Sequence, residues 1–277
     1  MTHPVPSTTY AGLAADDFGV TDHRAPLVLL HGLTFDRTMW RPALAELEAI
    51  DPGRRAISLD LPGQGESPDA PPYDLEAIGE HIRAAILEAG LRDPILVGHS
   101  ASASVAAMYA TVYPTSGIIL VEGGFLIGPF AAMLQSMEPI LRGPGFSAAW
   151  ARISEQAFRL DEVPTDVRSF VEATSRPRQE IVLGYWQQLF DRTPADLQAW
   201  VDAATATVRR SGLQVTSVVG QAPSPEEGAW LSANLPDART LVWPGSGHFP
   251  HLAHPRPFAE LLAETGVPAL SVPAAIS

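Results

Sequence analysis

The chain has 277 residues, a formal net charge of -13 at pH 7 and no cysteine. That length can bury a sizeable core, as one α/β domain with an insertion or as two small domains. The acidic balance argues against nucleic acid and against an anionic membrane surface as partners. The lack of cysteine excludes disulfides, thiolate metal sites and a cysteine nucleophile. We therefore expect a neutral or apolar small molecule as the partner.

The beginning of the sequence carries no recognisable targeting signal. Residues 1–6 form neither the basic nor the apolar region of a signal peptide, and no segment reaches about 18 consecutive apolar residues. We expect a soluble, cytoplasmic protein that does not enter a membrane. A homodimer is possible on the sequence alone.

Strands and helices alternate through the first part of the sequence. Residues 1–25 have room for one or two edge strands. Buried parallel strands are predicted by apolar runs at 27–30, 55–60, 95–98 and 117–122. Apolar residues at helical spacing predict helices at 40–50, at 75–86 after an N-capping Asp74, and at 103–110. Gly90 is expected just past the end of the second helix.

The alternation stops between 125 and 212, where apolar and aromatic residues recur at helical spacing. It resumes with strands at 213–219 and 240–243 and helices at 226–231 and 257–265, and the tail after Gly266 is expected to be loosely ordered. Such alternation with short connections is typical of a parallel sheet covered on both faces. We predict an α/β fold with a mostly parallel, doubly wound sheet, built from 1–124 and 213–277, and a helical lid at 125–212.

Ser100 is the candidate nucleophile. It follows the apolar strand that stops at Gly98, and a helix of small residues begins directly after it. A serine on such a sharp turn exposes its hydroxyl at the edge of the sheet. The pattern is close to G-x-S-x-G, with Ser102 in place of the last glycine. The alternative is a serine that only caps the helix.

A serine nucleophile needs a base, an acid that orients the base, and donors for the oxyanion. His248 lies in a glycine-flanked loop after the last strand, from which it could reach Ser100. His251 and His254 are rivals, although His254 precedes Pro255 at a helix start and is expected to serve the backbone. Asp60 is expected to fix the turn that follows it.

Four short motifs now occur in a fixed order along the chain. They are His31-Gly32, Asp60-Leu61-Pro62-Gly63-Gln64-Gly65-Glu66-Ser67, Gly98-His99-Ser100-Ala101-Ser102 and Gly247-His248-Phe249-Pro250. Together they resemble the α/β-hydrolase superfamily over nearly the whole chain. The resemblance implies the α/β-hydrolase fold, an oxyanion held by the backbone N–H groups of Leu33 and Ala101, and a reaction that needs no metal or organic cofactor.

The position of the acid that orients the base departs from the commoner pattern of this superfamily. That pattern places an aspartate after the penultimate strand. Residues 220–227 contain no aspartate, and Glu226 and Glu227 fall where a helix begins. Glu122 stands at the other location known in the superfamily and closes an apolar strand, where it needs a partner. We favour Glu122 as the acid, and Glu226 and Glu227 remain alternatives. With a glutamate at this position, the chain resembles the lactone hydrolases that open the macrolide ring of zearalenone.

The predicted activity is hydrolysis of a carboxylic ester or lactone of an apolar small molecule. Alternatives are a carbon–carbon bond hydrolase or acyltransferase of the same fold, and a receptor that binds a small molecule without turnover. Candidate substrate contacts are Gly32, Trp40, Phe125, Ile127, Phe130, Met133, Met137, Trp186, Phe190 and Phe249. For Trp40, packing in the core beneath the first helix is the favoured alternative.

Overall fold

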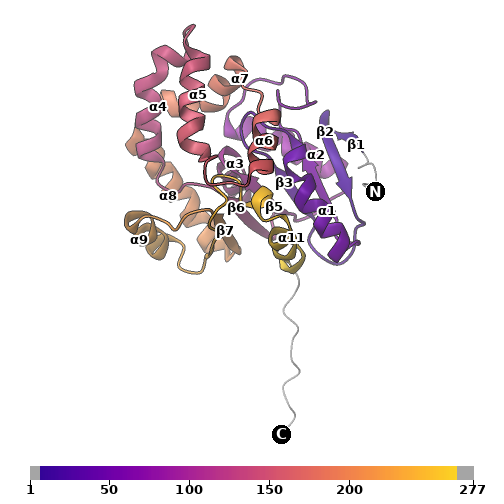
Figure 1. Cartoon of the computed structure of the whole chain (residues 1–277). Coiled ribbons are helices and arrows are strands. Elements are labelled where there is room, and N and C mark those ends of the chain that lie inside the picture. Colours follow the sequence, from indigo (N-terminus) through magenta and orange to yellow (C-terminus); the bar gives the residue numbers. More distant parts are fainter. Residues whose placement is uncertain (1–6, 267–277) are drawn as a thin grey trace.

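The computed structural model describes residues 7–266, so the expectations for the first six residues and for the tail after Gly266 lie outside the described residues. Its centre is an eight-stranded sheet with the order β1-β2-β4-β3-β5-β6-β7-β8 (Figure 1). The two edge strands allowed by the sequence are both present, β1 at Ser7–Tyr10 and β2 at Leu13–Phe18, and they run antiparallel.

The other six strands are parallel to one another. They are β3 at Leu27–Leu30, β4 at Ala56–Leu59, β5 at Ile95–His99, β6 at Gly117–Val121, β7 at Val215–Val219 and β8 at Arg239–Val242. The predicted fold class is confirmed. Each predicted strand is found within two residues of its expected ends.

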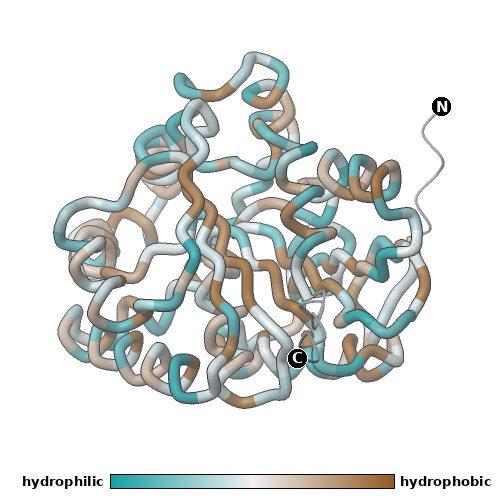
Figure 2. The backbone as a smooth tube through the Cα atoms, turned by 90° about the horizontal axis from the view of Figure 1, so that it is seen from below, coloured by the Kyte–Doolittle hydropathy of each residue, from teal (hydrophilic) through white to brown (hydrophobic). Residues whose placement is uncertain are grey.

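Apolar side chains pack on both faces of this sheet, because alternate side chains of a strand point to opposite sides. On β3, Leu27 and Leu29 pack on one face, and Val28 and Leu30 pack on the other. Figure 2 shows these hydrophobic strands running through the middle of the molecule. A strand buried on both faces reads as a continuous apolar run, which is why the run at 27–30 could be recognised.

Helices cover the two faces. Helix α1 at Arg41–Ile50 and α11 at Pro255–Glu264 pack together on one face, and α2 at Leu75–Glu88 and α3 at Ala101–Val112 pack on the other. Asp74 caps α2 by accepting from the N–H of Ala77, and Gly90 follows its end with φ +68°, as expected. Helix α9, at Pro225–Asn234, is longer than predicted.

Two short helices were not predicted. A 3₁₀ turn, η1 at Arg37–Trp40, precedes α1, and α10 at Pro250–Ala253 precedes α11. The expected start of the last helix at residue 257 is wrong, because α11 begins at Pro255. Proline suits the first turn of a helix, where its missing N–H would have no partner.

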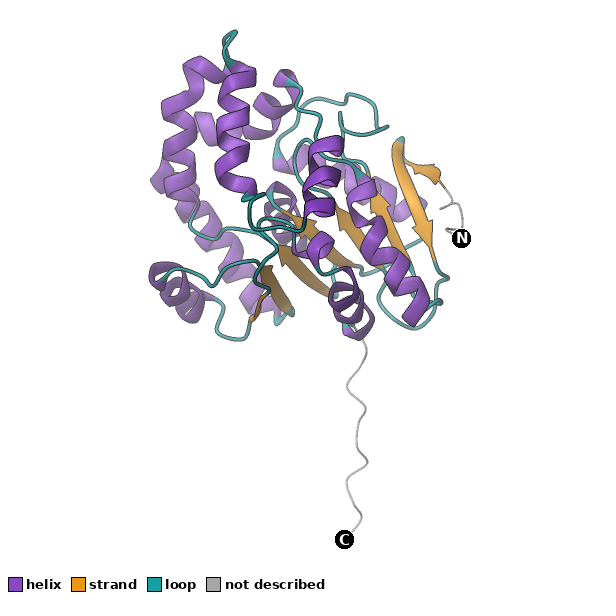
Figure 3. Ribbon diagram, in the orientation of Figure 1, coloured by secondary structure: helices purple, strands orange, loops and turns teal. Residues whose placement is uncertain are grey.

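Between β6 and β7 the chain forms five consecutive helices, which we call the helical insertion (Figure 3). They are α4 at Ile127–Leu141, α5 at Phe146–Phe158, α6 at Thr165–Thr174, α7 at Gln179–Asp191 and α8 at Pro194–Ser211. Apolar residues of the insertion pack on Leu33 and Ala101, which follow the carboxyl ends of β3 and β5. The insertion therefore covers the edge of the sheet where parallel α/β proteins bind ligands.

Among residues 7–266, every helix is too short or too polar to cross a lipid bilayer.

Candidate active site

Ser100 occupies a strained turn between β5 and α3. Its backbone has φ 56° and ψ -121°, a left-handed conformation that is costly for a residue with a Cβ. A Cβ at Gly98 would lie 2.2 Å from the carbonyl oxygen of Ser102, so glycine is required for the helix to approach the strand. Ser102 is itself buried, and its hydroxyl donates to the carbonyl oxygen of His31. The serine that departs from the glycine pattern therefore ties this turn to the loop after β3.

The structure brings Ser100, His248 and Glu122 together. The Ser100 Oγ and the His248 Nε2 are 2.8 Å apart, and the His248 Nδ1 lies 3.1 Å from the Glu122 Oε2. Because a carboxylate only accepts, Nδ1 carries the proton and Nε2 is free to accept from the serine hydroxyl. Serine, imidazole and carboxylate are thus joined by hydrogen bonds in the order that nucleophilic catalysis requires.

The Glu122 carboxylate is held by donors on both of its oxygens. The N–H of Gly220 donates to Oε1, and the Arg159 Nη2 lies 3.0 Å from Oε2, the oxygen that also faces His248. Burial raises the pKa of Glu122, but the hydrogen bond and charge of His248, the Gly220 amide and Arg159 outweigh it, so the pKa lies below its ordinary value. Glu122 also has φ 53°, a second strained backbone at the same place.

The alternative acids and bases lie elsewhere. Glu226 and Glu227 are in the first turn of α9, where carboxylates suit the helix dipole. His251 is fully buried, and the His254 Nε2 lies 3.3 Å from the carbonyl oxygen of Pro244. None of the four makes a hydrogen bond to Ser100 within the described part of the chain.

The backbone N–H groups of Leu33 and Ala101 donate to no acceptor within residues 7–266. Thr34, with φ 74°, donates its N–H to the Gln64 Oε1 at 2.6 Å, which fixes the loop after β3. A Cβ at Gly32 would lie 3.4 Å from the Ser100 Cβ, so this loop passes beside the serine. Two amides without an acceptor among the described residues therefore belong to the residue after Ser100 and to the loop that passes beside it.

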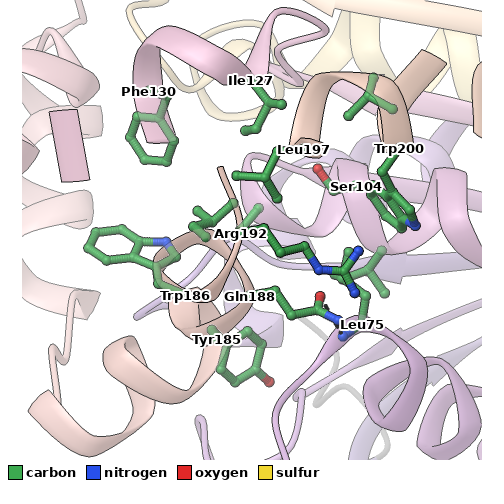
Figure 4. Close-up of a pocket in the computed structure, with 14 residues that line it drawn as sticks. Leu75, Ser104, Ile127, Phe130, Tyr185, Trp186, Gln188, Arg192, Leu197 and Trp200 are labelled. Carbon is green, nitrogen blue, oxygen red and sulfur yellow. Dashed lines mark hydrogen bonds between the residues drawn. The ribbon is translucent and has the colours of Figure 1, made fainter. Parts of the chain in front are cut away.

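An apolar cavity of about 110 Å³ opens beside Ala101, between α3 and the helical insertion (Figure 4). Of the predicted substrate contacts, Ile127, Phe130 and Trp186 line it. The other lining residues were not predicted from the sequence; they are Leu75, Ser104, Val105, Tyr185, Gln188, Leu189, Arg192, Leu197, Trp200 and Val201. Ser104 and Val105 could have been found from the helical spacing, since they lie one turn after Ala101.

Two predicted substrate contacts have no surface left for a substrate. Trp40 is 0% exposed and stacks on Phe258 with ring centroids 5.8 Å apart. Phe249 is also 0% exposed and packs edge-on against Phe35 and Phe158. Both aromatic rings are part of the core, so neither is a lining residue; for Trp40 this is the favoured alternative, and for Phe249 it corrects the assignment.

The remaining candidates do not line the cavity, and one of them, Gly32, is buried in the loop after β3. Phe125 stacks on Trp230 and lines two other cavities, one of which also reaches Glu122. Met133, Met137 and Phe190 pack within the insertion, and the Phe190 ring also faces the Arg142 guanidinium. Helical spacing marks such residues as inward-facing but does not say which neighbour each one meets.

The polar residues of the remaining motifs hold the framework together. Asp60 is fully buried, accepts from the backbone N–H of Arg37 at 2.6 Å and pairs with its guanidinium, as its expected role in the turn suggests. His99 is buried, and its Nε2 donates to the carbonyl oxygen of His248 at 2.8 Å. That hydrogen bond helps to hold the loop that carries His248.

His251 has no hydrogen-bond partner on either ring nitrogen among the described residues, and burial together with the nearby His248 lowers its pKa to about 3. The folded protein therefore binds fewer protons than the unfolded chain below about pH 6.5, and stability falls as the pH drops. We expect His251→Leu to lose about 2 kcal/mol less stability than the original between pH 7 and pH 5, whatever its stability at pH 8. Urea unfolding at each pH measures this, and equal losses in both proteins would contradict it.

Within residues 7–266, His, Asp and Glu side chains nowhere gather in a group of three or more that could hold a metal ion.

Arg159, which follows α5 in the insertion and contacts Glu122, was also not predicted from the sequence. A single arginine after a helix carries no signal in the sequence. Only the folded chain reveals it.

Several known proteins are similar to this chain in sequence or in fold. RutD of Escherichia coli O26:H11, whose name gives carbamate hydrolase as a provisional function, is 26% identical over 247 residues, covering 85% of this chain and 89% of RutD. A solved hydrolase from Pseudomonas aeruginosa PA01 has a TM-score of 0.72 at 20% identity, covering 92% of this chain and 94% of its own. The thioesterase domain from the curacin biosynthetic pathway has a TM-score of 0.66 at 18% identity, covering 94% and 99%.

The model of the alpha/beta hydrolase family matches residues 27–261, from the first parallel strand into the last helix. The resemblance found in the four motifs is thereby confirmed. The chain belongs to the alpha/beta hydrolase family.

Proposed function

We propose that this family member is a serine hydrolase that cleaves a carboxylic ester or lactone of an apolar small molecule. The observation that carries the proposal is the hydrogen-bonded series from the Ser100 Oγ through the His248 imidazole to the Glu122 carboxylate. The strained backbone of Ser100 gives independent support, because such strain clusters at functional sites.

In the proposed reaction, the Ser100 Oγ attacks the carbonyl carbon while its proton passes to the His248 Nε2. The oxyanion accepts from the N–H groups of Leu33 and Ala101. The intermediate collapses as His248 returns the proton to the leaving alcohol, and an acyl-enzyme remains. A water that gives its proton to His248 attacks the acyl carbon and releases the acid, and the proton returns to Ser100. Glu122 stays ionised and orients His248.

The cavity beside Ala101 supports an apolar substrate. Aromatic and aliphatic side chains from α3, α4, α7 and α8 line it, and Arg192 and Gln188 supply polar groups among them (Figure 4). We propose that the insertion acts as a lid that shields the acyl group from bulk water. The same chemistry would serve the carbamate and thioester bonds in the names of related proteins, and a lactone would remain tethered as its own leaving group.

A fluorophosphonate probe tests the nucleophile. We expect the probe to label the protein on Ser100, as mapped by peptide mass spectrometry, and Ser100→Ala to remain unlabelled. Ser232→Ala, which changes an exposed serine of α9, serves as the matched control and should label like the original. An unlabelled original protein, or labelling that survives Ser100→Ala, would refute the proposal.

A substrate panel then tests the reaction. It contains p-nitrophenyl esters of increasing acyl length, a macrolactone, a p-nitrophenyl carbamate and an acyl thioester. We expect turnover of esters or of the lactone that exceeds that of the carbamate and thioester. Labelling without turnover of any substrate would favour the small-molecule receptor, and turnover of the carbamate alone would replace the ester assignment.

A further inference from the structure

The turn that ends α5 reaches from the insertion to the His248 loop. The carbonyl oxygen of Phe158 accepts from the backbone N–H of His248 at 3.1 Å, and the Phe158 ring stacks on the imidazole with centroids 6.0 Å apart. The Nη2 of Arg159, the next residue, is 3.0 Å from the Glu122 Oε2 and 2.7 Å from the carbonyl oxygen of Gly247. One guanidinium nitrogen therefore joins the acid to the loop that carries the base.

Backbone geometry holds Arg159 in place at some cost. The residue is left-handed, with φ 49° and ψ 49°, which is unfavourable for a side chain with a Cβ. A Cβ at Gly247 would lie 2.6 Å from the carbonyl oxygen of Arg159, so only glycine allows the two turns to approach this closely. The strain and the close approach both serve to place the Arg159 side chain at Glu122.

Arg159 also changes the charge around the acid. Its side chain is 21% exposed and that of Glu122 is 10% exposed, so solvent screens the pair only in part. Among the described residues, Glu122 forms ion pairs only with Arg159 and with His248. Its carboxylate is thus shared between a permanent cation and an imidazole that becomes a cation during the proposed reaction.

We propose that Arg159 is a positioning residue, which fixes the Glu122 carboxylate and through it the His248 ring, and which shares the charge of that carboxylate with His248. This inference rests on the proposed function of Ser100, His248 and Glu122. It makes the assembly of the base and the acid depend on the docking of the helical insertion.

The surrounding titratable groups do not replace this charge. His99, with its ring 5.1 Å from that of His248, and His251 are buried, and burial lowers the pKa of both. The Glu162 carboxylate lies 3.8 Å from the Arg159 Nη1, and Glu227 lines the cavity that Glu122 and Arg159 share. Among the described residues none of these groups supplies a second cation at Glu122, so in a variant without the Arg159 charge the carboxylate faces His248 alone.

The test follows p-nitrophenyl acetate hydrolysis by Arg159→Met between pH 5 and pH 9. We expect kcat to fall about 10-fold with KM changed less than about 3-fold, because Arg159 does not line the apolar cavity beside Ala101. The acid limb of the kcat/KM profile should move up by about 0.5 to 1 pH unit. Arg159→Lys keeps the charge and should restore the limb to within about 0.3 unit.

Arg152→Met is the matched control, because Arg152 is exposed on α5, the helix that Arg159 follows, and makes no ion pair among the described residues. Its profile should equal that of the original. Arg159→Gln replaces Arg159→Met if the latter fails to fold, as judged by circular dichroism. An unmoved acid limb in a folded, uncharged variant would overturn the inference, even if kcat falls.

The labelling rate with the fluorophosphonate gives a second pH profile that does not depend on the choice of ester. It should move in parallel with kcat/KM in Arg159→Met. If the original protein is never labelled, the proposed function fails and the inference falls with it. If the original is labelled with a pH profile that Arg159→Met leaves unchanged, only the inference fails.

Discussion

Ser100→Ala should lower kcat for a p-nitrophenyl ester by about four to six orders of magnitude and leave the fold intact. The proposed reaction begins with the Ser100 Oγ, which lies 2.8 Å from the His248 Nε2. Removing this oxygen leaves only the binding site and the backbone amides, which retain a small residual rate. Steady-state kinetics with a purified variant, expressed without a background of host esterases, measure the change.

Ser232→Ala should keep the original kcat, since its hydroxyl donates only to a carbonyl within α9. Binding of the ester should change little in Ser100→Ala, because the cavity walls remain. A loss of less than about 100-fold would mean that another nucleophile or a bound water performs the attack. Thermal unfolding excludes a loss caused by misfolding, and we expect a melting temperature equal to or above the original, because Ser100 is strained.

The sequence predicted the sheet because its strands are short apolar runs between recognisable turns. The run at 27–30 is buried on both faces, and Asp74 and Gly90 mark the ends of α2 as their chemistry requires. The ends of the last helix were harder to predict. A proline can either stop a helix or begin one, so Pro255 and Pro257 gave no single start.

The positions of the three polar site residues could also be predicted from the order of the strands. Ser100, Glu122 and His248 each follow a parallel strand, and such strands end at the same edge of the sheet. Their proximity therefore follows from topology. The cavity walls and Arg159 could not be predicted in this way, because they depend on how the insertion helices pack. A helical pattern gives the apolar face of a helix but not its partner, which is why Phe249, assigned to the cavity, lies in the core.

Glu122→Gln should lower kcat by about 10⁴-fold, more than a lost hydrogen bond alone would explain. The reason lies in the donors around the carboxylate. The Gly220 N–H points at Oε1, and both Arg159 and the His248 Nδ1 point at Oε2. An amide has one accepting oxygen and one donating nitrogen, so in either orientation its NH₂ group faces a donor.

If the amide oxygen of the variant takes the place of Oε1, its NH₂ faces His248 and Arg159. His248 then accepts on Nδ1 and carries its proton on Nε2, where it cannot receive the proton of Ser100. If the amide is reversed, its NH₂ faces the Gly220 N–H, and the loop after β7 that contains Gly220 loses its acceptor. Either arrangement disables the base or displaces the loop that supports the acid.

Glu226→Gln provides the matched control, because Glu226 lies in the first turn of α9 and carries the same change of charge. It should keep kcat within about 2-fold of the original. Glu227→Gln completes the comparison of the three candidate acids. Near-normal activity in Glu122→Gln together with a large loss in either of the other variants would move the role of the acid to α9. The outcome expected here leaves Glu122 as the acid, since it alone of the three lies within hydrogen-bond distance of His248.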